Sequence, residues 1–124
     1  MTRILTLGWN PYAFSQADGD PHAPVFAAAH ARAAALDVDL VECLFAPADP
    51  PALLALIGAA LDAGPFDAIV IGGGLRKPPD LLALFEAVVN LVHRRAPAAA
   101  IAFNTSPADT VDSALRALGQ NPTR

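Results

Sequence analysis

The chain has 124 residues and a formal net charge of −4, and alanine supplies much of its 54% hydrophobic content. This length suits one domain over residues 1–124, and the lack of a long apolar run or of a basic face argues against a membrane and against nucleic acid as partners. Cys43 is the single cysteine and cannot form an internal disulfide, and the first residues lack the layout of a signal peptide. We therefore expect a cytoplasmic protein.

The first half of the sequence alternates between strand and helix patterns. The expected elements, in order, are a strand over residues 3–8, a helix from about 24 to 36, a strand over 38–45 and a helix from about 50 to 63. Asp49 is the expected N-cap of the second helix and Gly64 its stop. Asp39 and Glu42 place charges in the second strand, which suits the edge of a sheet. The polar stretch 9–23 is long for a strand-to-helix connection, which predicts a binding loop or, as the alternative, a disordered one.

A buried strand that ends in three glycines organises the second half. Residues 68–71 form an unbroken apolar run rich in β-branched side chains, typical of a strand covered on both faces of a parallel sheet. The glycines at 72–74 follow, then Arg76 and Lys77, and prolines that suit a helix start. Helix amides and two cations at the end of a strand attract anions, whereas the alternative is that the glycines only permit a tight turn. The pattern matches neither a nucleotide P-loop nor a dinucleotide-binding fingerprint.

The third helix and the fourth strand carry more apolar surface than one small domain needs to bury. The third helix is expected over residues 79–95, and Leu82, Val89 and Leu91 lie outside its core-facing stripe. The fourth strand, expected over 98–103, is apolar throughout although it falls at the edge of the predicted sheet. Both features predict a homodimer that forms through the third helix and the fourth strand.

The last helix follows Ser106, which fits a capping box with Asp109, and ends at Gly119. Four strands alternating with helices predict a single three-layer α/β domain, Rossmann-like or flavodoxin-like, with helices on both faces of a parallel sheet of order 2-1-3-4. The winding reverses between the first and third strands. We therefore expect a ligand crevice at the carboxyl ends of these strands, beside Gly8 and Gly74.

A small anionic metabolite is the expected occupant of this crevice, and we predict neither a cofactor nor a metal site. The predicted ligand-binding residues are Asn10, Gly73, Gly74, Arg76, Lys77, Asn104 and Thr105. His22 with Asp20 is the candidate acid–base pair, and a solvated loop histidine is the alternative. Whether the ligand is turned over stays open, with a ligand-free dimeric interaction module and a hydrolase or transferase using His22 and Asp20 as alternatives.

One longer pattern runs through the second half. The residues that form it are Gly72-Gly73-Gly74-Leu75-Arg76, Leu84-Phe85-Glu86, Val89-Asn90, His93 and Phe103-Asn104-Thr105-Ser106-Pro107-Ala108-Asp109-Thr110. This pattern resembles an uncharacterised family of small bacterial and fungal Rossmann-like α/β proteins. The resemblance implies that Arg76, Asn90, His93, Asn104, Thr105, Asp109 and Thr110 belong to a family pattern. It implies no activity, and it does not reach the amino-terminal half, where His22 lies.

Overall fold

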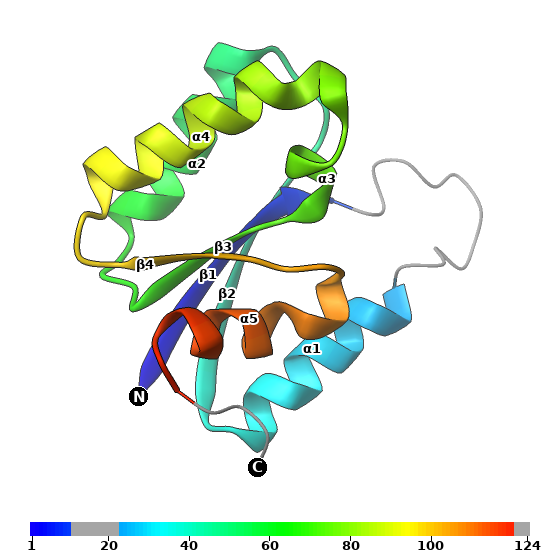
Figure 1. Ribbon diagram of the computed structural model, residues 1–124, viewed down its shortest axis with the longest axis vertical. Coiled ribbons are helices and arrows are strands. Elements are labelled where there is room, and N and C mark those ends of the chain that lie inside the picture. The colour runs from blue at the N-terminus through cyan, green and yellow to red at the C-terminus, as the bar shows by residue number, and fades with distance from the viewer. Residues whose placement is uncertain (11–22, 121–124) are drawn as a thin grey trace.

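A computed structural model of the protein describes residues 1–10 and 23–120 (Figure 1). The strands are β1 (Thr2–Trp9), β2 (Val38–Phe45), β3 (Ala68–Ile71) and β4 (Ala100–Phe103). The helices are α1 (Ala23–Ala35), α2 (Pro50–Asp62), α3 (Gly73–Arg76), α4 (Leu82–Arg95) and α5 (Thr110–Ala117). Two short 3₁₀ helices, η2 (Pro79–Leu81) and η3 (Pro107–Asp109), precede α4 and α5.

The four strands form one parallel sheet of order β2-β1-β3-β4, as predicted. β3 pairs in parallel with β1, from Ala68 opposite Ile4 to Ile71 opposite Leu7, so both strands end at the same edge of the sheet. All four residues of β3 are buried, because this strand lies between two others and beneath helices on both faces. The segments that follow β1 and β3 are therefore neighbours.

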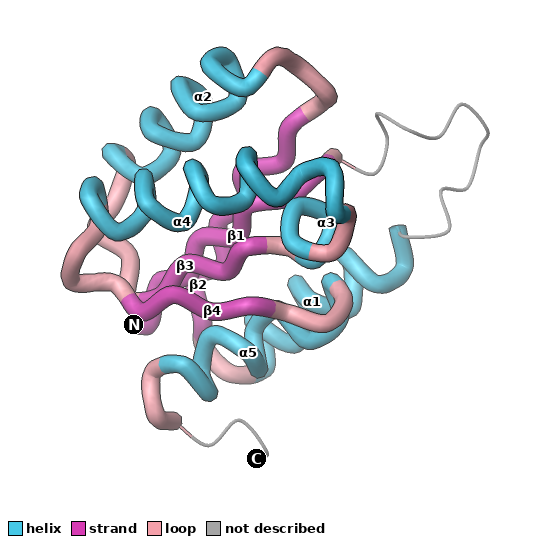
Figure 2. The backbone as a smooth tube through the Cα atoms, turned by 45° about the horizontal axis from the view of Figure 1, so that its top comes forward, coloured by secondary structure: helices cyan, strands magenta, loops and turns pink. Residues whose placement is uncertain are grey.

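Helices cover both faces of the sheet, which gives the three predicted layers. α2 and α4 lie on one face and α1 and α5 on the other (Figures 1 and 2). Successive strand residues point to opposite faces, so Ile69 and Ile71 join one core cluster while Ala68 and Val70 join the other. The longest described helix, α4, has 14 residues, and no helix in the described ranges combines the length and the hydropathy that a membrane span requires.

The glycine segment differs from its prediction. It forms a short helix of its own, α3, and η2 follows before α4 begins at Leu82. The sequence predicted that the amides of the third long helix face the end of β3. In the structure the amides of α4 do not, because α3 and η2 lie between. Figure 2 shows α3 directly at the end of β3. The reason is a Gly-Gly-Leu-Arg run that can make one helical turn, while the Pro78-Pro79 pair prevents that turn from continuing into α4.

Three smaller predictions differ in detail from the structure. β4 begins at Ala100, two residues later than expected, because the Ala99 amide donates to Ala96 O in a turn. Gly64 directly follows Ala63, the C-cap of α2, as expected for its stop, but it lacks the positive φ of Gly119, which is 76°. Val89 and Leu91 are partly buried against the core cluster beneath α4, so only Leu82, 63% exposed, remains as apolar surplus on that helix.

Candidate functional site

Trp9 and Gly74 connect the ends of β1 and β3. The Trp9 indole Nε1 donates to Gly74 O at 3.1 Å, and the Gly72 amide donates to Leu7 O at 2.8 Å. A β-carbon on Gly74 would lie 2.6 Å from Trp9 Cδ1, a separation that real β-carbons essentially never show. The indole also packs edge-on against Phe45 of β2, with ring centroids 5.0 Å apart. Trp9 thus occupies the space beside Gly74 where the sequence predicted an open crevice.

Asn104, directly after β4, is the centre of a buried hydrogen-bond network. Its side chain is 4% exposed; Oδ1 accepts from the Gly73 amide at 3.2 Å, and Nδ2 donates to Thr110 Oγ1 at 2.9 Å. This amide therefore joins the start of α3 to the start of α5. Because both polar ends of the side chain are used within the protein, Asn104 orients the two segments instead of pointing freely to a ligand.

Arg76 and Lys77 reach across from α3 to the segment after β4. Arg76 Nη2 donates to Asn104 O at 2.6 Å, and Lys77 Nζ donates to Thr105 O at 2.9 Å. In the described part of the chain neither cation has a carboxylate partner within ion-pair distance. Arg76 Nε is buried and has no hydrogen-bond partner among these residues. Within residues 1–10 and 23–120, the two cations at this edge of the sheet therefore have no acidic partner.

Asp109 closes the same segment from the other side. Its carboxylate accepts from the amides of Thr105 and Ser106 and from the Thr105 hydroxyl, whose Oγ1 lies 2.6 Å from Oδ2. Burial alone would raise the pKa of Asp109, but these hydrogen bonds and the nearby Arg116 charge hold that pKa below its ordinary value. The Thr105 hydroxyl is therefore committed to Asp109.

The structure brings five of the seven predicted ligand residues into one cluster. These are Gly73, Arg76, Lys77, Asn104 and Thr105, and they contact one another through the bonds given above. Gly74 lies beside them under Trp9. Asn10 lies on the other side of β1, where its amide donates to Phe45 O at 2.9 Å. The candidate pair His22 and Asp20 falls outside the described residues.

Two further members of this cluster, Trp9 and Thr110, were not among the predicted ligand-binding residues, although the sequence placed Trp9 beside the expected crevice. Trp9 is the last residue of β1, yet nothing in its neighbours shows that its indole lies on Gly74, which is distant in sequence. Thr110 entered the prediction only through the family resemblance, and its hydroxyl proves to be the partner of the Asn104 side chain.

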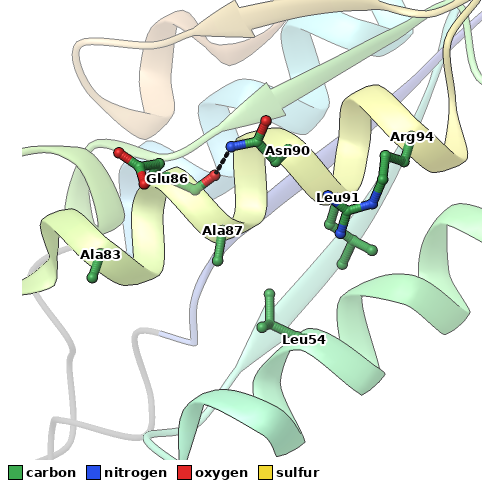
Figure 3. A pocket seen from close by; sticks show the side chains of 7 residues that line it. All are labelled: Leu54, Ala83, Glu86, Ala87, Asn90, Leu91 and Arg94. Carbon is green, nitrogen blue, oxygen red and sulfur yellow. Dashed lines mark hydrogen bonds between the residues drawn. The ribbon is translucent and has the colours of Figure 1, made fainter.

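A second feature of the surface is an open groove between α2 and α4, with a volume of about 390 Å³ (Figure 3). Its lining residues are Leu54 from α2 and Ala83, Glu86, Ala87, Asn90, Leu91 and Arg94 from α4. Figure 3 shows Leu54 and Ala87 pointing toward each other across it, while Glu86 and Asn90 lie on its rim. The groove runs along α4 from Ala83, in its first turn, to Arg94, in its last.

Two other groups that could carry chemistry, Cys43 and His30, are buried and paired, respectively. Cys43 is buried in β2, and burial raises the pKa of its thiol, which disfavours the reactive thiolate. His30 pairs with Glu42 across α1 and β2. Within residues 1–10 and 23–120, no three His, Cys, Asp or Glu side chains gather as metal ligands would. The cationic edge at Arg76 and Lys77 is therefore the feature with chemistry to explain.

No protein-family model matches the chain, and no curated protein is similar enough to count as a relative. The family resemblance drawn from the sequence pattern therefore stays a prediction.

Proposed function

We propose that the protein binds a small anion at the carboxyl edge of its sheet, beside Arg76 and Lys77. The observation that carries the proposal is the Arg76 guanidinium, which has no carboxylate partner in the described ranges and keeps a buried Nε without a hydrogen-bond partner. A buried donor that lacks a partner costs about 1–3 kcal/mol. A ligand oxygen at this position removes that cost, so the free energy of ligand binding includes it.

The chemical class of the ligand follows from the remaining donors. A guanidinium forms two parallel hydrogen bonds with a carboxylate or a phosphate, and the Lys77 ammonium adds a mobile positive charge. The Gly73 amide and the Thr105 hydroxyl are already used by Asn104 and Asp109, so they are not part of this proposal. The proposed ligand is a carboxylate or phosphate group on a small metabolite, and turnover is not included.

The test is the shift in thermal unfolding temperature caused by inorganic phosphate, pyrophosphate and citrate as probes. We expect a shift for the wild type, a smaller one for Arg76→Lys, and none for Arg76→Ala. The matched control is Arg95→Ala, because α4 carries Arg95 to the opposite edge of the sheet, where it pairs with Asp62. Each variant is compared with and without the probe, so a lower starting stability does not affect the result. Equal shifts for Arg76→Ala and the wild type contradict the proposal.

A second candidate function is association with another chain through α4 and β4. Two apolar side chains favour it: Leu82 on α4 is 63% exposed and Phe103 at the end of β4 is 38% exposed. Phe103 also contacts Phe85 of α4, with ring centroids 5.9 Å apart, so the strand and the helix are in apolar contact at this end. We propose a homodimer, and the molar mass in solution, measured by light scattering during gel filtration, tests it.

A further inference from the structure

The outer face of α4 carries a row of exposed side chains in which one anion and one cation lie at equal distances from a central asparagine. Leu82, Glu86, Asn90 and Arg94 follow at intervals of four residues, so they form one ridge along the helix, and all four are exposed. At about 1.5 Å per residue, Glu86 and Arg94 lie about 6 Å on either side of Asn90. Asn90 Nδ2 donates to Glu86 O within the helix at 2.9 Å (Figure 3).

Both charges of this ridge lack an ion-pair partner in the described part of the chain. Among the described residues neither Glu86 nor Arg94 forms an ion pair, whereas the adjacent Arg95 pairs with Asp62 of α2. Within a helix, partners lie three or four residues away, and those positions around Glu86 and Arg94 hold no opposite charge. The helix therefore presents one anion and one cation that no described residue of the same chain pairs.

The surface beside the ridge allows a second helix to come close. Ala83 and Ala87 line the groove between α2 and α4, and their small side chains keep the distance between packed helices short. Leu54 and Leu91 give apolar contact within the same groove. The site thus combines a close approach with one charge near each end.

We propose that α4 of a second copy of this chain docks here, antiparallel to the first and related to it by a twofold axis at Asn90. In such a pair, a residue that precedes Asn90 by a given number of positions contacts the residue of the second copy that follows Asn90 by the same number. Glu86 therefore contacts Arg94 of the second copy, and this ion pair forms twice. Leu82 then contacts the second copy beyond the carboxyl end of its α4. A parallel arrangement would bring Glu86 to Glu86 and Arg94 to Arg94, which like-charge repulsion opposes.

This inference rests on the proposed association and assigns it to the outer face of α4. It is tested with the charge reversals Glu86→Arg and Arg94→Glu, singly and together, by measuring the dimer dissociation constant from molar mass over a concentration series at low salt. We expect each single reversal to weaken the dimer by about tenfold or more, because two pairs are lost and like charges face each other at both positions. The double variant recovers the wild-type constant, because its charges are exchanged at both positions.

Two control variants keep the outcomes separate. Arg95→Glu reverses a charge next to the ridge and leaves the dimer constant unchanged, and circular dichroism establishes that each variant is folded. If the wild type is monomeric at every concentration, the result contradicts both the proposed association and the proposed α4 geometry. A dimer that resists both single reversals, or that the double variant does not restore, overturns the geometry alone. If Phe103→Lys then dissociates that dimer, the association uses β4.

Discussion

At the scale of single residues, the side chain of Trp9 decides that only glycine fits at position 74. Trp9 Cδ1 would lie 2.6 Å from a β-carbon at Gly74, and the indole is held in place by its bond to Gly74 O and by Phe45. At Gly73 the nearest atom is Lys77 Cε at 3.1 Å, in a flexible side chain that can move aside. Of these adjacent glycines in one helical turn, only Gly74 is therefore required to be glycine by its surroundings.

We expect Gly74→Ala to lower the free energy of unfolding by about 1–3 kcal/mol, because the indole must leave its position. Gly73→Ala is the matched control and changes stability by less, since only the lysine chain must shift and alanine favours a helix. Urea unfolding followed by the fluorescence of Trp9, the single tryptophan, measures both. Similar losses in the two variants contradict this account of Gly74.

Arg76 and Lys77 show where sequence reasoning stops at this scale. Their position after a buried strand predicted cations at the carboxyl edge, and they lie there. The sequence did not show that both donate to carbonyls of Asn104 and Thr105. Every residue has a carbonyl group, so its part in such a bond leaves no mark in the sequence. Only the register between β3 and β4 brings these particular carbonyls within reach.

At the scale of elements, the best predictions came from contacts between residues close in sequence. The capping box of Ser106 and Asp109 was predicted from their spacing and is confirmed, with Pro107 at the start of η3. Asp49 caps α2, as predicted, through its contact with the Ala52 amide. By contrast, α3 was not predicted, because a single helical turn has too few residues to show a periodic pattern.

Asp109 makes the stability of this segment depend on pH. The pKa of Asp109 is lower in the folded state than in the unfolded chain, where it is about 4. The ionised carboxylate therefore stabilises the protein at a pH above the unfolded pKa, and this contribution is lost as the pH falls through the lowered, folded-state pKa. We expect Asp109→Ala to cost about 0.5–2 kcal/mol at neutral pH, as for the loss of a helix cap. The difference from the wild type then shrinks under acid conditions.

The measurement is the free energy of unfolding at a series of pH values from neutral to acid. Asp80→Ala is the control, because Asp80 is an exposed carboxylate in η2. It removes a negative charge without removing the bonds to Thr105 and Ser106. A loss in Asp109→Ala that stays constant down to the lowest pH shows that the ionised carboxylate is not the stabilising group.

At the scale of the whole molecule, the order of the strands could be predicted from their polarity. β2 carries Asp39 and Glu42 and lies at one edge, where these side chains pair with Arg3 and His30. β1 and β3 lie in the middle, and their most apolar residues are fully buried. β4 forms the other edge although it has no charged residue. This apolar edge strand is the reason that the sequence predicted a partner chain.

The backbone amides of β4 decide whether that edge is open. The Ala100 amide donates to Asp67 O of the neighbouring segment at 3.0 Å, so the amides of Ala100 and Ala102 face β3 while those of Ile101 and Phe103 face outward. On the outward side, Phe103 O accepts from Arg116 Nη2 at 3.2 Å. A dimer built on the outer face of α4 leaves both outward amides without a strand partner.

We therefore expect the amides of Ile101 and Phe103 to exchange with solvent at least about tenfold faster than those of Ala100 and Ala102, since only the inner pair is held in the sheet ladder. Hydrogen exchange followed by nuclear magnetic resonance resolves the four amides at a concentration where the protein is dimeric. Pairing of β4 with a second β4 would instead slow Ile101 and Phe103 as strongly as their neighbours, and dilution to the monomer would reverse it. The exchange pattern of one short strand thus distinguishes a helix-mediated dimer from a continuous sheet across two chains, independently of any substitution.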